Sequence, residues 1–213
     1  MKSLFKNGML ALSLLLMLTF LLIYITAHHI LTVGFYENSG DPLSGIPGQD
    51  ISVYETLQKW IYISSAIYLL LKLAIITLIL HTALYLNNQD VSIDKIFRVT
   101  VLAEFIFLIP ATVKIISFPY TFPQGTLLDW HKYYILSLLS FFENTPADWY
   151  YALQTFNLFE IGYWFLLAYG ISKISTLNYD RSLRIVITGY VPALVIWVAA
   201  VTFFTLLMFP STG

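Results

Sequence analysis

Cysteine is absent from this sequence of 213 residues, which excludes disulfides, cysteine nucleophiles and thiolate metal sites. Charged residues make up only 11% of the chain, whereas a soluble domain usually carries about 25%. The net charge is -1, and no basic tail favours nucleic-acid binding. Hydrophobic residues make up 58% of the chain, with a mean hydropathy of +0.75. This composition predicts an integral membrane protein surrounded mostly by lipid.

Motifs for intramembrane proteolysis and for nucleotide hydrolysis are also missing. The chain has no His-Glu-x-x-His, no Gly-x-Ser-x-Gly and no Gly-x-x-x-x-Gly-Lys sequence. His28 and His29 are neighbours and would point about 100° apart on a helix, so they do not converge on one metal. A metal site would also need His131 or His81, and His81 is predicted near the opposite membrane face. We expect a non-enzymatic protein without metal or cofactor.

Five apolar runs reach the length of about 20 residues that a helix needs to cross about 30 Å of hydrocarbon. We therefore predict an all-α helical bundle that forms a single transmembrane domain over residues 1–213. The predicted spans are 8–31, 60–86, 99–118, 150–171 and 185–209.

The first run also resembles a signal peptide. Lys2 and Lys6 precede it, and Ile25-Thr26-Ala27 is similar to a signal-peptidase site. Its apolar stretch exceeds the 7–15 residues usual for such a core, so we expect this run to be retained as a membrane anchor.

The distribution of charges predicts the orientation, because lysine and arginine near helix ends stay on the cytoplasmic side. With the N-terminus inside, the cytoplasmic segments hold seven basic and three acidic residues, and the outer segments hold two basic and seven acidic ones. The C-terminus then lies outside, and a bacterial inner membrane is the membrane we favour. The cytoplasmic basic residues are Lys2, Lys6, Lys95, Arg98, Lys173, Arg181 and Arg184.

Both predicted outer loops are longer than the usual connection, so a function carried by a loop is expected outside. Residues 39–48 contain turn sequences that suit either a binding loop or a solvated connector. In the second loop, Thr126 and Asp129 resemble a capping box, which predicts a helix over 127–142 that lies in the interface or dips into the membrane. A crossing there would place Arg181 and Arg184 outside, which the charge count opposes.

Polar residues form stripes on three of the predicted spans. A charge near the bilayer centre costs several kcal/mol, so such residues usually face the protein interior and have a partner. Counting about 1.5 Å per residue places Lys72 and Glu160 at a similar depth, and we predict an ion pair between them. The stripes that could converge on an outward-opening cavity comprise Tyr24 and His28, then Ser65, Tyr68 and Lys72, and finally Gln154, Asn157 and Glu160.

Three interpretations of this polar cluster stay open: hydrogen bonds that hold helices together, a ligand or ion pathway, and contact with spans of another protein. On the third span, Pro110 follows Glu104 and removes a backbone donor, which predicts an interruption that frees the carbonyl of Ile106. We favour a structural kink there. Lys114 lies near the outer end, where its ammonium can reach the headgroups.

Residues 180–184, Asp-Arg-Ser-Leu-Arg, and 187–194, Ile-Thr-Gly-Tyr-Val-Pro-Ala-Leu, introduce the fifth span. Together with five spans, these motifs resemble the Yip1 group of small polytopic membrane proteins, mainly over the last two helices. The resemblance implies a five-helix bundle that acts through protein partners and has no catalytic residues. Permease subunits of ABC importers are less similar, because they need a larger cytoplasmic coupling segment than the inner loops here provide.

Two functional hypotheses follow. In the first, the chain is a non-catalytic subunit or scaffold that binds other membrane or envelope proteins through its outer loops and helix faces. In the second, it is a transporter of ions or small solutes with a polar site around Lys72 and Glu160. The first depends on the long outer loops, and the second depends on the paired charges and polar stripes.

Overall fold

The computed structural model describes residues 8–32, 35, 50–142 and 145–208, and for 50–58 and 147 it describes the backbone alone. The predicted all-α fold is confirmed over this part of the chain, which contains helices and no strand. Four helical stretches are long and apolar enough to cross a membrane: Gly8–His29, Lys59–Leu86, Ile93–Thr121 and Tyr179–Met208. The predicted first outer loop, with its turn sequences at 39–48, lies outside the described residues.

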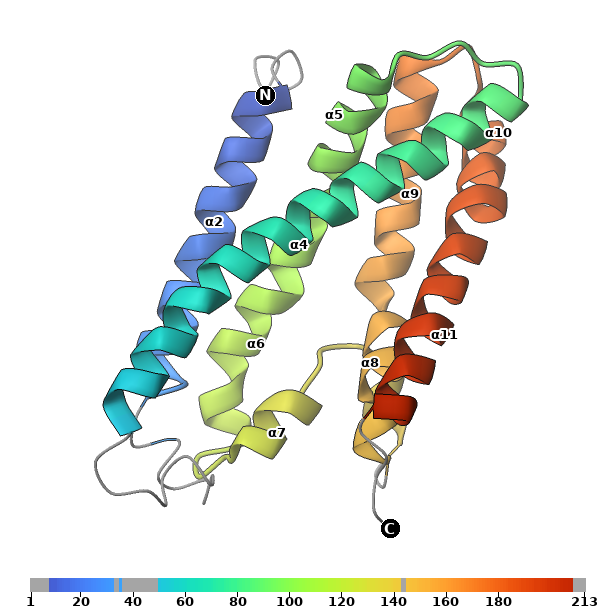
Figure 1. Cartoon of the computed structure of the whole chain (residues 1–213). Helices are drawn as coiled ribbons and strands as arrows, with labels where there is room; N and C mark the ends of the chain where they lie inside the picture. Colours follow the sequence, from blue (N-terminus) through green and yellow to red (C-terminus); the bar gives the residue numbers. More distant parts are fainter. Residues whose placement is uncertain (1–7, 33–34, 36–49, 143–144, 209–213) are drawn as a thin grey trace.

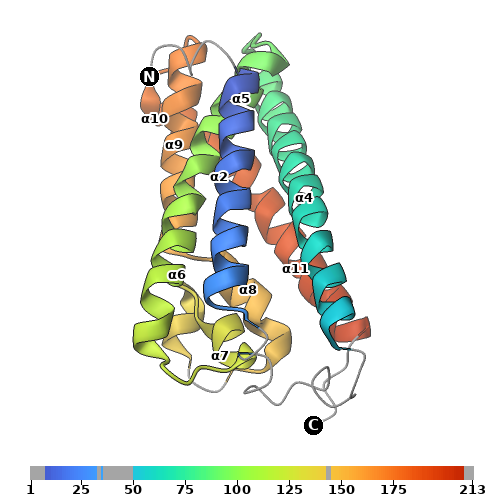
Figure 2. The same cartoon turned by 90° about the vertical axis from the view of Figure 1, so that its left-hand side faces the viewer.

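The first two long helices are α2 (Gly8–His29) and α4 (Asp50–Leu86). Helix α2 begins at the same end of the bundle at which α4 ends, and α4 is steeply tilted across the molecule (Figure 1). Helix α4 begins ten residues before the predicted second span. A view from the side shows α2 between α6 and α4 (Figure 2).

The third predicted span is interrupted close to its middle. Helix α5 (Ile93–Glu104) is followed by one 3-10 turn, η2 (Phe105–Phe107), and then by α6 (Leu108–Thr121). Pro110 lies in the first turn of α6, where its missing N–H costs no intrahelical hydrogen bond. The interruption therefore lies just before Pro110.

The predicted fourth span is wrong as a continuous helix. It consists of α8 (Tyr150–Thr155) and α9 (Leu158–Ile174), with a break at Phe156 and Asn157. The Asn157 side chain accepts a hydrogen bond from the Glu160 N–H at 2.9 Å, so it caps a new helix. The break is stabilised by a further segment, described below.

The C-terminal stretch contains three elements: α10 (Tyr179–Ile185), a π-helical turn η5 (Val186–Tyr190) and α11 (Val191–Met208). A π turn inserts one residue into the helix and changes the direction of the side chains around it. The helical stretch that they form begins at Tyr179, six residues before the predicted fifth span.

The predicted helix over 127–142 is wrong beyond Lys132. Helix α7 (Leu127–Lys132) has the predicted capping box between Thr126 and Asp129. After it, Leu136 takes a left-handed φ of 52°, and a 3-10 turn η3 (Leu138–Phe141) follows. A second 3-10 turn, η4 (Ala147–Trp149), leads into α8. Since the Leu138 N–H bonds to the Phe156 carbonyl and the Leu158 N–H to the Leu136 carbonyl, this segment pairs with the break in the fourth span instead of forming its own helix.

Two groups of buried apolar side chains hold the bundle together. One joins α2, α4 and α5 around Leu15, Leu73 and Val101. The other joins α4, α5, α9 and η5 and includes the fully buried Leu80 and Tyr163. Because α4 and α5 contribute to both groups, they connect the N-terminal helix to the C-terminal half of the bundle.

Close packing of α5 against α9 depends on Gly170. A Cβ atom at this position would lie 2.3 Å from Val99 Cγ1, so Gly170→Ala forces the two helices apart. Overpacking of this kind costs about 1–3 kcal/mol. We expect a lower melting temperature for Gly170→Ala and partial recovery in Gly170→Ala/Val99→Ala, measured by thermal unfolding in detergent. Equal melting temperatures for wild type and Gly170→Ala would contradict the packing.

Candidate functional site

An ion pair between the partly buried Lys72 and the buried Glu104 lies at the centre of the candidate site. Lys72 on α4 donates to Glu104 Oε1 at the end of α5, with 2.5 Å between the nitrogen and the oxygen. The Glu104 side chain is 6% exposed and the Lys72 side chain is 23% exposed. An ion pair that is largely removed from water stabilises a fold only when its geometry is good and other groups support it.

Aromatic rings provide part of that support. The Lys72 ammonium lies 4.0 Å from the centre of the Phe107 ring and 5.6 Å from the centre of the Tyr163 ring. The negative face of an aromatic ring attracts a cation, more strongly when both are removed from water. The 3-10 turn η2 directly after Glu104 supplies Phe107, so the interruption of the third span places the acid and this ring on the same lysine.

Glu160 has different partners. The Tyr190 hydroxyl donates to Glu160 Oε1 at 2.8 Å, and the Trp164 indole N–H donates to the same oxygen at 3.0 Å. Tyr163 lies between the two groups of partners, because its ring lies 5.7 Å from the Tyr190 ring and 5.6 Å from the Lys72 ammonium. The Tyr163 hydroxyl and Glu104 Oε2 are both buried without a hydrogen-bond partner among the described residues.

The predicted Lys72–Glu160 ion pair is therefore wrong, and two features of the helices explain why. Helix α5 begins at Ile93, so Glu104 lies about 16 Å along it and deeper in the bundle than a span starting at Val99 implies. The tilt of α4 shortens the vertical distance between Lys72 and the end of the helix (Figure 1). Both effects bring Lys72 level with Glu104.

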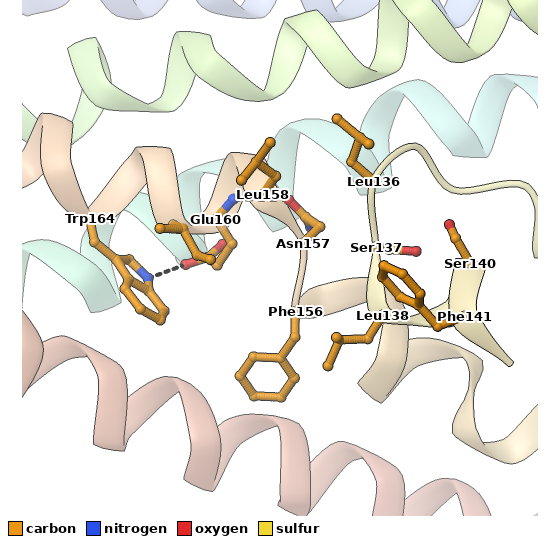
Figure 3. Close-up of a pocket in the computed structure, with 11 residues that line it drawn as sticks. Leu136, Ser137, Leu138, Ser140, Phe141, Phe156, Asn157, Leu158, Glu160 and Trp164 are labelled. Carbon is orange, nitrogen blue, oxygen red and sulfur yellow. Dashed lines mark hydrogen bonds between the residues drawn. The ribbon is translucent and has the colours of Figure 1, made fainter.

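A cavity of about 490 Å³ lies next to Glu160, where the segment 136–141 meets the start of α9. Figure 3 shows Leu138, Phe156 and Trp164 extending to the same side, toward α11. Most of its lining is apolar, which differs from the polar cavity that the stripes predict. Its lining residues are Leu136, Ser137, Leu138, Ser140, Phe141, Phe156, Asn157, Leu158, Glu160, Ile161 and Trp164.

The other residues of the predicted cluster have separate roles. The His28 ring stacks on the Tyr24 ring, and its Nδ1 lies 3.0 Å from the Tyr24 carbonyl, so both groups interact within α2. Gln154 donates to the His131 carbonyl at 2.5 Å. Asn157 caps α9 as described above. These residues stabilise local structure and do not converge on Lys72.

Tyr68 lies one turn before Lys72 on the same face of α4 and is 55% exposed. At the outer end, burial and then the charge of Lys114 lower the pKa of His131 below its usual range, which favours a neutral imidazole. No group of three metal-ligating side chains occurs in the part of the chain that the structure describes.

Sequence reasoning missed Phe107, Tyr163, Trp164 and Tyr190. A signal was present for two of them, because Tyr163 and Trp164 follow Glu160 at the spacing of three and four residues that places side chains on one helix face. The other two reach the site through η2 and η5, whose irregular geometry no apolar pattern indicates.

The arrangement offers one compensated ion pair and one carboxylate with two donors, on four helices of the bundle. Such a network holds helices in a fixed register, and the second carboxylate borders a cavity of ligand size. Comparison of the chain with protein-family models, curated proteins and solved structures gives no match, so the resemblance to the Yip1 group stays a prediction.

Removing one member of the ion pair leaves the other charge buried. For soluble proteins this costs about 3–5 kcal/mol, whereas replacing both partners by apolar residues is often neutral. We expect Lys72→Met and Glu104→Leu each to lower the melting temperature strongly, and Lys72→Met/Glu104→Leu to recover most of the loss. If the loss of melting temperature in the double variant equals the sum of the two single losses, Lys72 and Glu104 do not stabilise each other.

Proposed function

We propose that this chain is a non-catalytic subunit or scaffold of a membrane protein complex that binds its partner at the outer end of the bundle. The observation that carries the proposal is the apolar cavity beside Glu160 and the exposed apolar side chains around it. Phe141 is 80% exposed, and Leu136 and Leu158 are each more than half exposed.

The short length of α9 supports a protein partner at this position. Its 17 residues span about 25 Å, less than the roughly 30 Å of a hydrocarbon core. The break at Phe156 and the segment 136–141 then lie at the edge of the hydrocarbon, where non-helical backbone is tolerated only when protein or water covers it. A partner in the cavity would provide this cover.

The membrane topology that fits the proposal has five crossings, of which α8 and α9 form the fourth as a broken helix. Helix α5 begins and α9 ends at the end of the bundle where α2 begins (Figure 1), so Lys95 and Arg98 near the start of α5 and Lys173 in the last turn of α9 belong to that end. Basic residues favour the cytoplasmic side, so we infer a cytoplasmic N-terminus and an external C-terminus. The sharp charge bias fits a bacterial inner membrane.

A second candidate function is transport of an ion or small solute through the site around Lys72 and Glu160. Three irregular stretches surround these charges: η2, η5 and the break between α8 and α9. Interrupted helices beside ionisable groups form the substrate sites of many secondary transporters, and π turns frequently occur at functional sites.

The partner is tested by co-purification of the tagged protein after gentle detergent extraction, with mass spectrometry of what remains bound. We expect a stoichiometric membrane protein with wild type and a loss of at least tenfold with Leu136→Asn/Phe141→Ser. Asparagine tolerates the left-handed φ of position 136, and both side chains are exposed, so the fold should survive. Tyr120→Ser is the matched control, because Tyr120 is exposed and lies outside the cavity lining. A monodisperse wild-type protein without a partner would contradict the proposal.

Substitution of Glu160 separates the two functions. Glutamine keeps the oxygen that accepts from Tyr190 and Trp164, so Glu160→Gln should change the melting temperature little, whereas Glu160→Ala loses both hydrogen bonds at about 1–3 kcal/mol each. A scaffold with Glu160→Gln keeps its partner. If Glu160→Gln folds and retains the partner but abolishes uptake into proteoliposomes, the transport function is favoured instead.

A further inference from the structure

We propose that the opposite, basic end of the molecule has a binding site for one anionic phospholipid, between α5 and α9. A cavity of about 430 Å³ lies there, separate from the one beside Glu160. Three basic side chains border it: Lys95 and Arg98 on α5, and Lys173 on α9. None of these residues belongs to the ion pair or to the Glu160 site.

The positions of the three cations suit a phosphate group. Lys95 and Arg98 are one turn apart on α5, and Lys173 faces them from the last turn of α9. Asp94 pairs with Arg98 but is well exposed, so the cavity keeps a net positive charge after this pair is counted. The Arg98 stem packs against Gly8 at the start of α2, which restrains the guanidinium at the rim.

The remaining lining suits the acyl chains of the same lipid. Below the cations, the walls consist of apolar side chains and the bare backbone of Gly170, against which Val99 packs closely. Leu166 and Tyr169 are exposed on the outside of α9 and continue this apolar surface along the helix. The lining residues below the cations are Val99, Leu102, Ala103, Leu166, Tyr169, Gly170 and Ile174.

Position along the bundle also favours a lipid over a soluble anion. Lys95 and Arg98 belong to the first two turns of the membrane-compatible stretch Ile93–Thr121, which is where headgroups meet a helix. Basic pockets between helix ends on the cytoplasmic side bind the phosphates of anionic lipids, and a cavity with cations above an apolar floor matches a molecule with that same polarity. We infer a phosphatidylglycerol-like or cardiolipin-like ligand.

The test is titration of the purified full chain in detergent with phosphatidylglycerol, followed by native mass spectrometry of the retained lipid. We expect one tightly held phosphatidylglycerol for wild type and binding roughly 30-fold weaker for Lys95→Gln/Lys173→Gln. Both lysines are exposed, and their loss should leave the melting temperature of the lipid-free protein unchanged. Arg181→Gln/Arg184→Gln removes the same charge from exposed positions outside the cavity and should bind as wild type does.

Two further ligands test whether the site requires both the charged headgroup and the acyl chains. Phosphatidylcholine has the acyl chains without net charge, and glycerol phosphate has the charge without chains. Neither should occupy the site at the concentration at which phosphatidylglycerol half-saturates it. Equal binding by wild type and Lys95→Gln/Lys173→Gln, an equal loss in the arginine control, or equal occupancy by either of these two ligands would overturn the proposal.

Discussion

Moving a lysine and a glutamate out of water costs several kcal/mol for each ion, and this bundle meets that cost by placing Lys72 directly on Glu104. The need to keep these two charges in contact also fixes how the helices around them pack. Helix α4 must cross α5 at the level of Glu104, and the rings of Phe107 and Tyr163 must approach the ammonium. Once α4 and α5 are held in this register, α2 packs on one side of them and α9 and η5 on the other.

The irregular turns of the bundle have a common physical role. Regular helices present side chains at fixed intervals of about 100°, and the site needs groups that those intervals do not supply. The 3-10 turn η2 brings Phe107 to Lys72, and the π turn η5 aims Tyr190 at Glu160. The break before α9 exposes the helix N-terminus that Asn157 caps and opens the cavity beside Glu160. The Glu160 carboxylate is thus fixed by hydrogen bonds from the bundle and also borders the cavity.

Length and hydropathy were sufficient to predict the helical class and the approximate positions of the four membrane-compatible stretches, because a long apolar run has few alternatives in lipid. They failed at 133–142 and at Phe156, where a backbone pairing between segments distant in sequence overrode an apolar pattern that suits a helix. They also assigned the wrong partner to Lys72. Depth counted along an untilted helix cannot include the tilt of α4 or the early start of α5, and one of the two donors to Glu160, Tyr190, lies on a π turn that no periodicity marks.

The register that Lys72 and Glu104 fix also requires η5 to pack on α4, which holds Tyr190 against Glu160. Since the chain has no cysteine, a pair of introduced cysteines reports this contact without a background. A Cβ atom at Gly189 would lie 2.9 Å from the Ala83 Cβ, so the two positions are in direct contact, and a shift of about 1 Å reaches the Cβ separation of about 3.8 Å in disulfides. Mild oxidation in native membranes should cross-link Ala83→Cys/Gly189→Cys rapidly, and should leave Ala83→Cys/Ile187→Cys, whose second residue is exposed, largely unlinked. Equal cross-linking of the two pairs, or none in the first, would contradict the packing on which the network depends.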